Sequence, residues 1–418
     1  MTRRGSTRLS ARPTVAPRVG LFGLLGSGNL GNNVSMESVL RYLRTDHPEA
    51  IVDAMCLGPE TVTGRYGIPA ITMSWYQRYE RTASGLPSIM LKLLGKAIDV
   101  FRTSWWVSRH DVVIVPGMGT MEASLPLKSW QLPYSFLLVC TSAKIFGTKV
   151  AFVSVGAGVV KRRATRILLD VSARLAFYRS YRDAPSLEFM RQRGVDTSRD
   201  HVYSDLAFGI PPLPCGPGEQ GFVGVGVMGY RGGNDDRRQA SAIRASYVAT
   251  MKSFVRWLID NDRRVLILVG DENEPDKLVS EEVLADIQAY RSDLEPGRVA
   301  LKYTSSFAEL MEEMAPVATV VATRFHTVVC ALRLGKPVVS LGYAPKFKAL
   351  LAKMSLAEFC QQAKNPDIDV MIAQFTELEK RQEGIRQAIA EGNAVCERDV
   401  AAQFAELSTV LFAADGGR

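Results

Sequence analysis

The segment Arg324-Phe325-His326 carries the clearest chemistry in the sequence, and it follows the apolar run 317–322. In an extended segment, side chains two positions apart point to the same side, so Arg324 and His326 can face one ligand. Arginine binds phosphate or carboxylate through two N–H groups, and histidine exchanges protons near neutral pH. The segment therefore predicts an anion site with a general acid or base. The alternative is a histidine that only hydrogen-bonds the backbone at a helix start.

Two other segments place polar side chains after apolar runs. Arg182 follows a short apolar run and precedes Asp183, which is suited to cap the next helix. Tyr343 and Lys346 follow the run 337–341. Ligands of open α/β sheets bind at the carboxyl ends of the strands, so we expect Arg182, Tyr343 and Lys346 at a ligand site. A surface ion pair and an ordinary strand-to-helix loop are the alternatives.

Three glycine-rich turns, at 23–32, 116–120 and 156–158, also follow apolar runs. Glycine lets the backbone approach a ligand, and a helix N-terminus attracts an anion. Together the turns predict one rim of a cleft, although each could be a tight turn without a ligand. The residues that we expect to bind substrate in the first two turns are Gly28, Asn29, Gly31, Gly117 and Gly119.

Short apolar runs alternate with helical spacings along the whole chain. The predicted strands are 19–25, 51–57, 111–115, 149–155, 222–228, 264–269, 317–322 and 337–341. The clearest predicted helices are 33–44, 167–176, 245–261, 280–290 and 325–334. Such alternation is typical of parallel sheets covered by helices on both faces. We therefore predict an α/β protein with two doubly wound Rossmann-like domains that face a cleft.

The composition places the boundaries of these domains. Residues 211–221 are rich in proline and glycine, which favours a linker. It separates an N-terminal α/β domain, 18–210, from a C-terminal α/β domain, 222–375. Residues 376–418 have a long helical pattern that is expected to pack back across both domains, and residues 1–17 are predicted to be a disordered basic tail.

Charge and cysteine content narrow the class of protein. The formal net charge of +8 favours anionic partners, and no nucleic-acid-binding motif is recognisable, so phosphate-bearing ligands are expected rather than nucleic acid. The six cysteines have no Cys-x-x-Cys spacing, which indicates reduced thiols and no metal site. The basic start and the run 19–25 resemble a signal peptide but lack a cleavage site. We expect a cytoplasmic protein.

The segment 86–109 combines apolar residues at helical spacing with four basic residues and the pair Trp105-Trp106. The favoured interpretation is a surface helix whose apolar face packs in the core of the first domain. The alternative is a basic amphipathic helix at a membrane surface, which would put the protein at the inner face of the membrane as a peripheral protein.

Taken in order, these segments resemble the polysaccharide pyruvyl transferase family over about residues 18–350. The segments that carry the resemblance are Gly28–Gly31, Gly117–Gly119, Arg182–Ser186, Asp205–Phe208, Arg324–His326, Gly335–Pro337 and Tyr343–Lys346. Two positions depart from the family pattern. Asn32 stands where members usually have an acid, and Met118 interrupts the usual triple glycine.

The resemblance implies a GT-B-like fold and phosphoenolpyruvate as donor. It implies that Arg324, Arg182 and Lys346 bind the phosphate and carboxylate of the donor, with His326 as general acid and the C-terminal domain as the donor side. The N-terminal domain would hold the acceptor, a saccharide or lipid-linked saccharide, for ketal formation in cell-surface polysaccharide or glycolipid synthesis. This reaction requires no cofactor and no metal.

Two alternatives from other functional classes stay open at this point. The first is a GT-B-type glycosyltransferase that uses a sugar nucleotide, for which Glu274 and Asp276 are candidate ribose ligands. The second is a non-catalytic scaffold in polysaccharide assembly, which the departures at Asn32 and Met118 would explain.

Overall fold

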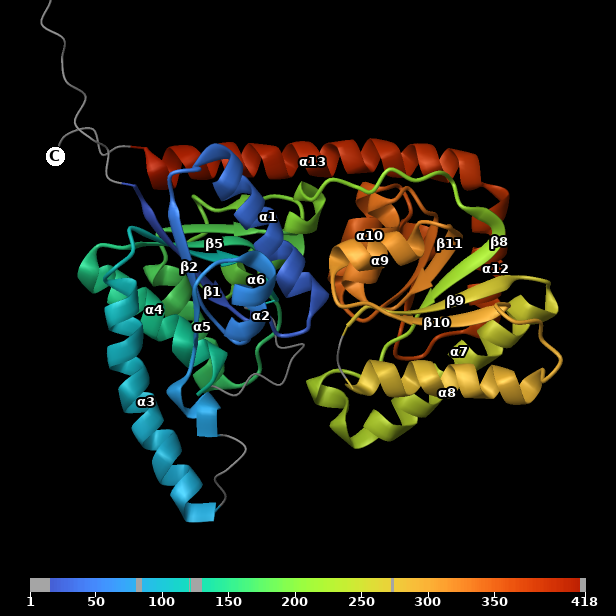
Figure 1. Ribbon diagram of the computed structural model, residues 1–418, viewed down its shortest axis with the longest axis horizontal. Coiled ribbons are helices and arrows are strands. Elements are labelled where there is room, and N and C mark those ends of the chain that lie inside the picture. Colours follow the sequence, from blue (N-terminus) through green and yellow to red (C-terminus); the bar gives the residue numbers. More distant parts are fainter. Residues whose placement is uncertain (1–15, 80–84, 120, 122–129, 272–273, 414–418) are drawn as a thin grey trace, which may run out of the picture.

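The computed structural model of the chain describes residues 16–79, 85–119, 121, 130–271 and 274–413 (Figure 1). The basic tail predicted at residues 1–17 lies almost entirely outside them. Within the described part, no helix is long and apolar enough to cross a membrane.

The first sheet has seven parallel strands in the order β3-β2-β1-β4-β5-β6-β7. Its strands are β1 (Arg18–Gly23), β2 (Ile51–Cys56), β3 (Ala70–Thr72), β4 (Val112–Pro116), β5 (Lys149–Val155), β6 (Tyr178–Tyr181) and β7 (His201–Val202). The helices with it are α1 (Leu30–Asp46), α2 (Pro59–Tyr66), η1 (Trp75–Tyr79), α3 (Gly85–Val107), α4 (Leu132–Phe146), α5 (Arg163–Leu175), α6 (Ala184–Gln192) and η2 (Leu206–Gly209).

The second sheet has six parallel strands in the order β10-β9-β8-β11-β12-β13. Its strands are β8 (Glu219–Gly226), β9 (Arg264–Val269), β10 (Val299–Tyr303), β11 (Val317–Ala322), β12 (Val338–Gly342) and β13 (Cys360–Gln362). The helices that follow in the chain are η3 (Asn234–Gln239), α7 (Ala240–Asp260), α8 (Glu274–Tyr290), α9 (Phe307–Met314), α10 (Phe325–Arg333), α11 (Pro345–Lys353), η4 (Ala357–Phe359), α12 (Ile368–Lys380) and α13 (Gln382–Phe412).

The two sheets share one topology. In each, the chain first winds outward in one direction and then returns to the centre to wind in the other. The reversal lies between β1 and β4 in the first sheet and between β8 and β11 in the second. Ligands of doubly wound sheets bind outside the strand ends at this reversal. The prediction of two doubly wound Rossmann-like domains is confirmed.

Every predicted strand is present, because the central strands are continuous apolar runs. The strands predicted at 149–155, 264–269 and 317–322 have the predicted ends, and the ends of the others are shifted. β4 and β11 are buried along their whole length, as strands covered on both faces must be. The edge strands β3, β7, β10 and β13 were not predicted, since they are short or partly exposed and lack such a run. The helical pattern predicted from residue 376 is two helices, α12 and α13, which meet at Arg381.

Helix α13 runs along one side of both domains (Figure 1). Its first half contacts the C-terminal domain, where Arg333 pairs with Glu397 and Gly392 lies against Met354. Its second half contacts the first sheet, where Gln403 bonds to Ser154 and Ser180. The helix therefore joins the two domains a second time, in addition to the segment 211–218. The domain boundaries themselves stay a prediction.

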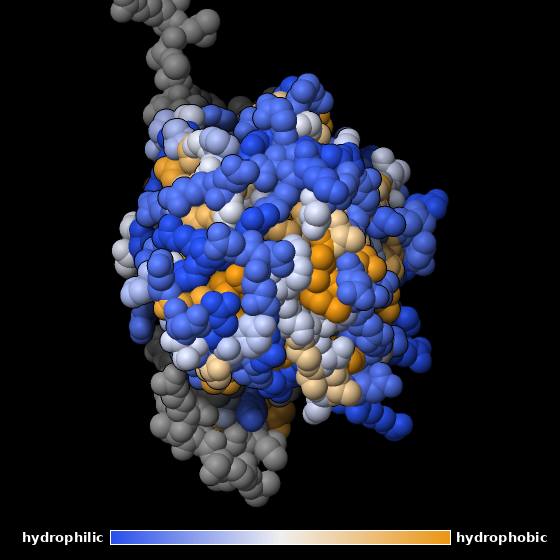
Figure 2. All heavy atoms as spheres, turned by 90° about the vertical axis from the view of Figure 1, so that its right-hand side faces the viewer, coloured by the Kyte–Doolittle hydropathy of each residue, from blue (hydrophilic) through white to orange (hydrophobic). Residues whose placement is uncertain are grey.

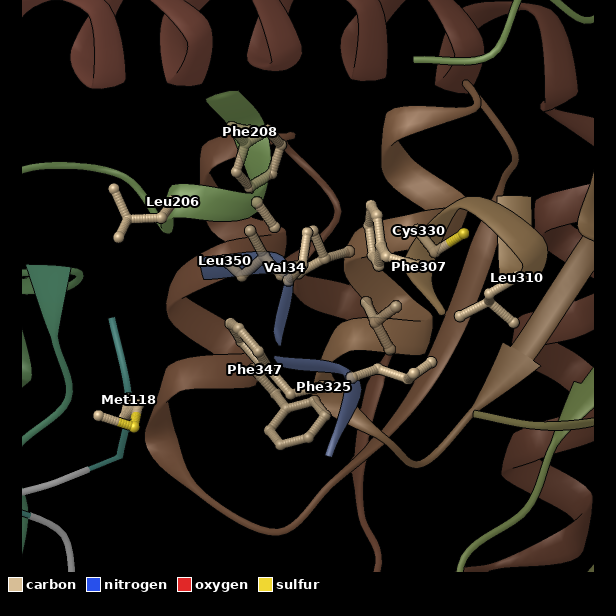
Figure 3. Packing of buried hydrophobic residues seen from close by; sticks show 14 of the residues in the cluster. Val34, Met118, Leu206, Phe208, Phe307, Leu310, Phe325, Cys330, Phe347 and Leu350 are labelled. Carbon is tan, nitrogen blue, oxygen red and sulfur yellow. The ribbon is translucent and has the colours of Figure 1, made fainter. Parts of the chain in front are cut away.

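The surface of the C-terminal domain, at the right-hand end of Figure 1, is mostly hydrophilic, with apolar residues in separate patches (Figure 2). The buried apolar residues of the two domains form one connected cluster. Figure 3 shows part of it, with Val34 and Leu206 of the first domain beside Phe325, Phe347 and Leu350 of the second. Shared packing thus fixes the strand ends of the two sheets relative to each other.

Candidate active site

A cleft of about 820 Å³ lies where the strand ends of the two sheets face each other. The turns after β1, β4 and β6 line it from the first domain, and the turns after β8, β9, β11 and β12 line it from the second. The cleft gathers every site residue predicted from the sequence: Gly28, Asn29, Gly31, Gly117, Gly119, Arg182, Arg324, His326, Tyr343 and Lys346.

His326 lies in the first turn of α10, directly after β11, and its side chain is 17% exposed. The imidazole crosses to the first domain and lies against Gly31 at the start of α1. A Cβ atom on Gly31 would come within 1.9 Å of Cε1 of His326. Glycine is therefore required at this position to admit the histidine ring, and not only to let the backbone approach a ligand.

Asp205 links His326 to Arg182. Its Oδ1 lies 3.8 Å from Nε2 of His326, and Nη1 of Arg182 donates to its Oδ2 at 3.4 Å. The carboxylate also caps η2 by accepting from the Ala207 N–H. Burial alone would raise the pKa of Asp205, but the contact with His326 and the charge of Arg182 outweigh burial and hold this pKa below its usual range. The histidine thus faces a fixed negative charge.

Arg324 directly precedes α10 and is held by two carboxylates of its own domain. Its Nε and Nη2 donate to the two oxygens of Asp276, at 2.6 and 2.9 Å, and its Nη1 lies 3.1 Å from Oδ2 of Asp271. Burial opposes the charge on Arg324, but the bonds to Asp276 and the charges of Asp271 and Asp276 raise the pKa of the guanidinium. Three of its five N–H groups are engaged in this way.

Asp271 ties the second domain to the first. The carboxylate follows β9, and it accepts from Asn29 Nδ2 at 3.1 Å and from the Leu30 N–H at 3.3 Å. It therefore occupies the helix N-terminus that the sequence predicted as an anion site. Burial raises the pKa of Asp271, against the charge of Arg324 and together with that of Asp276.

Arg182 and Lys346 approach the ring of Phe325 from different domains. The guanidinium carbon of Arg182 and the ammonium nitrogen of Lys346 each lie 5.2 Å from the centre of that ring. The same ammonium nitrogen lies 5.6 Å from the centre of the Tyr343 ring. These cation–π contacts hold both cations at the cleft.

The two departures from the family pattern have structural explanations. Asn32 lines the cleft and braces the first glycine turn through long contacts from its Nδ2 to Leu24 O and Ser27 Oγ, both at 3.4 Å. Met118 is buried and turned away from the cleft. Its sulfur accepts from the Leu24 N–H, and its methyl group fills the space beside Gly23. Neither side chain disrupts the strand ends.

Sequence reasoning missed several residues of the cleft. Arg231 and Arg237 line it from the turn after β8, and Asp271 and Asp276 line it from the segment after β9. The glycine-rich stretch 229–233 follows a predicted strand, so the strand-end rule applied elsewhere would have found Arg231. Arg237 lies further along the chain, in η3. Asp276 was considered only as a ribose ligand; it is fully buried, and it binds Arg324 and the Gly229 N–H.

The cleft is cationic. Its described lining has five cationic side chains, Arg182, Arg231, Arg237, Arg324 and Lys346, against the carboxylates of Asp271 and Asp276. Such a surplus suits a ligand with several negative charges. In the described part of the chain, no group of three or more His, Cys, Asp and Glu side chains is placed to hold a metal ion.

Comparisons with known proteins agree with this geometry. The family model for polysaccharide pyruvyl transferase matches residues 29–345. No curated protein sequence matches the chain.

The similar solved structures include a putative UDP-N-acetylglucosamine 2-epimerase from Listeria monocytogenes, with a TM-score of 0.62 at 10% identity over 96% of this chain and 98% of that one. UDP-GlcNAc 2-epimerase from Neisseria meningitidis bound to UDP-GlcNAc has a TM-score of 0.59 at 12% identity, over 94% of this chain and 99% of that one. HepE from Anabaena in complex with UDP and glucose has a TM-score of 0.58 at 12% identity, over 95% of this chain and 100% of that one. At such identities the likeness concerns the GT-B-like fold alone.

Proposed function

Because this chain belongs to the polysaccharide pyruvyl transferase family, we propose that it transfers the pyruvyl group of phosphoenolpyruvate to two hydroxyls of a sugar as a ketal. One observation carries the proposal: His326 lies in a cleft with a surplus of cationic side chains from both domains. Phosphoenolpyruvate has about three negative charges near neutral pH, and such a cleft would offset them.

The donor needs cations and an acid. In this proposal Arg182, Lys346 and the outward N–H groups of Arg324 bind its phosphate and carboxylate. His326, protonated and positioned by Asp205, donates its proton to the methylene carbon, which becomes a methyl group and leaves an oxocarbenium-like carbon at C2. General acid catalysis of this kind is worth 10²–10⁴-fold, or roughly 3–5 kcal/mol of the barrier.

The remaining steps conserve atoms and charge. One sugar hydroxyl adds to C2 and loses its proton, the C–O bond to phosphate breaks, and a second hydroxyl of the sugar closes the ketal with loss of its proton. One of the two released protons restores His326, and the other leaves with inorganic phosphate. The cations that bind the donor also stabilise the departing phosphate.

The acceptor is proposed to bind on the side of the first domain, along the turns that contain Gly28 and Gly117–Gly119. We propose a saccharide or a lipid-linked saccharide of cell-surface polysaccharide or glycolipid synthesis as acceptor, and the family match supports a saccharide in general. Phosphoenolpyruvate is a cytoplasmic metabolite, so we place the reaction on the cytoplasmic side.

Phosphate release tests the proposal. Wild-type protein is mixed with phosphoenolpyruvate and a panel of free and lipid-linked saccharides, and released phosphate is measured. We expect release only with a suitable acceptor, and a loss of at least about 100-fold in His326→Ala. The control is His201→Ala, because this ring is half exposed, pairs with Glu406 and does not line the cleft. Unchanged turnover in His326→Ala would exclude the assigned role.

A sugar-nucleotide glycosyltransferase is the competing function, since the similar solved structures include complexes with UDP and UDP-GlcNAc. The bonds of Asp276 to Arg324 and Gly229 disfavour it, because they occupy the carboxylate that would hold a ribose. Thermal shift separates the two functions: stabilisation by phosphoenolpyruvate supports pyruvyl transfer, and stabilisation by nucleoside diphosphates alone supports the alternative. Stabilisation by neither ligand would favour the scaffold.

A further inference from the structure

Helix α3 exposes a row of large apolar side chains. Met90, Leu93, Leu94, Phe101 and Trp105 are between 54% and 77% exposed. Separations of three, four and seven residues put them on one face of the helix. We call these five residues the α3 stripe. The interpretation that the apolar face of this segment packs in the core is wrong for them.

The opposite face of α3 holds the helix firmly to its domain. Trp106 and Val107 are buried in the core. The buried carboxylate of Asp99 accepts from the Trp75 N–H at 2.7 Å and from the Ser74 hydroxyl at 3.0 Å. The stripe is therefore a fixed outward face. The helix projects beyond the rest of the first domain, on the side opposite α13 (Figure 1).

Basic side chains accompany the stripe. Lys92 and Arg109 are exposed, whereas Lys96 and Arg102 are each 25% exposed and pair with Asp99, the one acid of residues 85–109. Asp99 is buried on the inner face, so it offers no negative charge at the surface. Arg109 lies 4.5 Å from the ring centre of Trp105, at one end of the stripe, and Lys92 lies near the other end.

We propose that the α3 stripe docks the protein on a bilayer surface with anionic lipid headgroups. Leu and Phe side chains of an interfacial helix enter the acyl boundary, Trp prefers the interface, and Lys and Arg bind anionic headgroups. A projecting convex helix suits a bilayer, whereas a second protein would need a matching groove. The outer face of the C-terminal domain is mostly hydrophilic, with apolar residues in separate patches (Figure 2).

Co-sedimentation with lipid vesicles tests the proposal on the full chain. We expect the wild type to pellet with vesicles of phosphatidylcholine mixed with phosphatidylglycerol, and much less with phosphatidylcholine alone. Leu93→Ser/Phe101→Ser should lower the partition coefficient at least about 10-fold. The matched control is Leu278→Ser/Val370→Ser, which removes two exposed apolar side chains from the C-terminal domain. Raised salt should weaken binding to the anionic vesicles.

Equal binding by the stripe variant and the control would overturn the proposal. The proposal would also be overturned if the wild type did not bind vesicles but formed a dimer, and if the two stripe substitutions disrupted that dimer. The stripe would then be a contact between copies of the chain. Circular dichroism checks that the variant is folded. The assay contains no substrate, so its result is independent of pyruvyl transfer, and phosphate release with a free saccharide should be equal in the variant and the wild type.

Discussion

The carboxylate of Asp205 serves three groups at once: Arg182, His326 and the N–H at the start of η2. Its pKa is lowered in the folded protein, which means that the ionised carboxylate is more stable there than in the unfolded chain. That stability is fully present above the ordinary aspartate pKa of about 3.9 and is lost as the pH falls towards the folded value. Asp205 therefore couples folding to the position of the imidazole.

Asp205→Asn keeps the shape and the cap but removes the charge. We expect it to cost about 2 kcal/mol of unfolding free energy at pH 7, as a lost charged hydrogen bond does. The difference from the wild type should shrink as the pH falls below about 3.9. Urea unfolding at several pH values measures this difference in unfolding free energy. The pH profile of phosphate release should also change in the variant. A pH-independent difference would mean that the charge is not the cause.

Asp271 places a negative charge beside the cations of the cleft. Asp271→Asn can still accept from the Leu30 N–H, but it no longer repels an anionic donor. We expect phosphoenolpyruvate to bind about 10-fold more tightly, which corresponds to about 1.4 kcal/mol. Calorimetry compares it with Asp262→Asn, which removes an exposed charge elsewhere in the same domain. Weaker donor binding would instead show that the Asp271 carboxylate builds the site.

At the scale of elements, the start of α1 and the start of α10 must approach each other closely. Gly31 permits this because His326 fills the space that a side chain would need. The distance is set by two helices on different domains, so neither can shift alone.

Gly31→Ala should displace the imidazole. We expect kcat/KM for phosphoenolpyruvate to fall at least about 10-fold, since small misplacements of a catalytic group are costly. Stability should fall by about 1–3 kcal/mol through overpacking. Gly384→Ala on α13 is the control, because open space surrounds its Cβ position. Full activity of Gly31→Ala would separate His326 from the catalytic step.

Local sequence predicted the elements that are apolar runs and the residues that follow them. Arg182, Arg324, His326 and Lys346 were predicted because each follows a strand, and parallel strands end at one edge. The partners were not predicted because they come from distant elements. Asp271 caps a helix about 240 residues earlier, and Met118 packs at Gly23. No local pattern encodes such pairs.

At the scale of the whole molecule, α13 holds the two domains in one body. Gln403 is fully buried on this helix; it donates to Ser180 at 2.7 Å and accepts from Ser154 at 3.0 Å. A residue near the C-terminal end of α13 thus hydrogen-bonds to β5 and β6 of the first sheet.

Gln403→Ala should lower the unfolding free energy by about 1–3 kcal/mol, because it leaves buried hydroxyls with fewer partners. We expect the first domain to unfold before the second, so that urea unfolding shows two transitions. Gln387→Ala removes an exposed amide from the same helix and is the control. Coincident unfolding curves for the two variants would show that α13 does not support the first domain.

The return of α13 also has a consequence for synthesis on the ribosome. The strands of the first domain are complete by residue 202, but Gln403 emerges roughly 200 residues later. At about 5–20 residues per second, the nascent domain waits about 10–40 s for its last helix. During that interval the side of the sheet around Ser154 and Ser180 has no cover from α13, so the first domain reaches its final stability only after α13 has emerged.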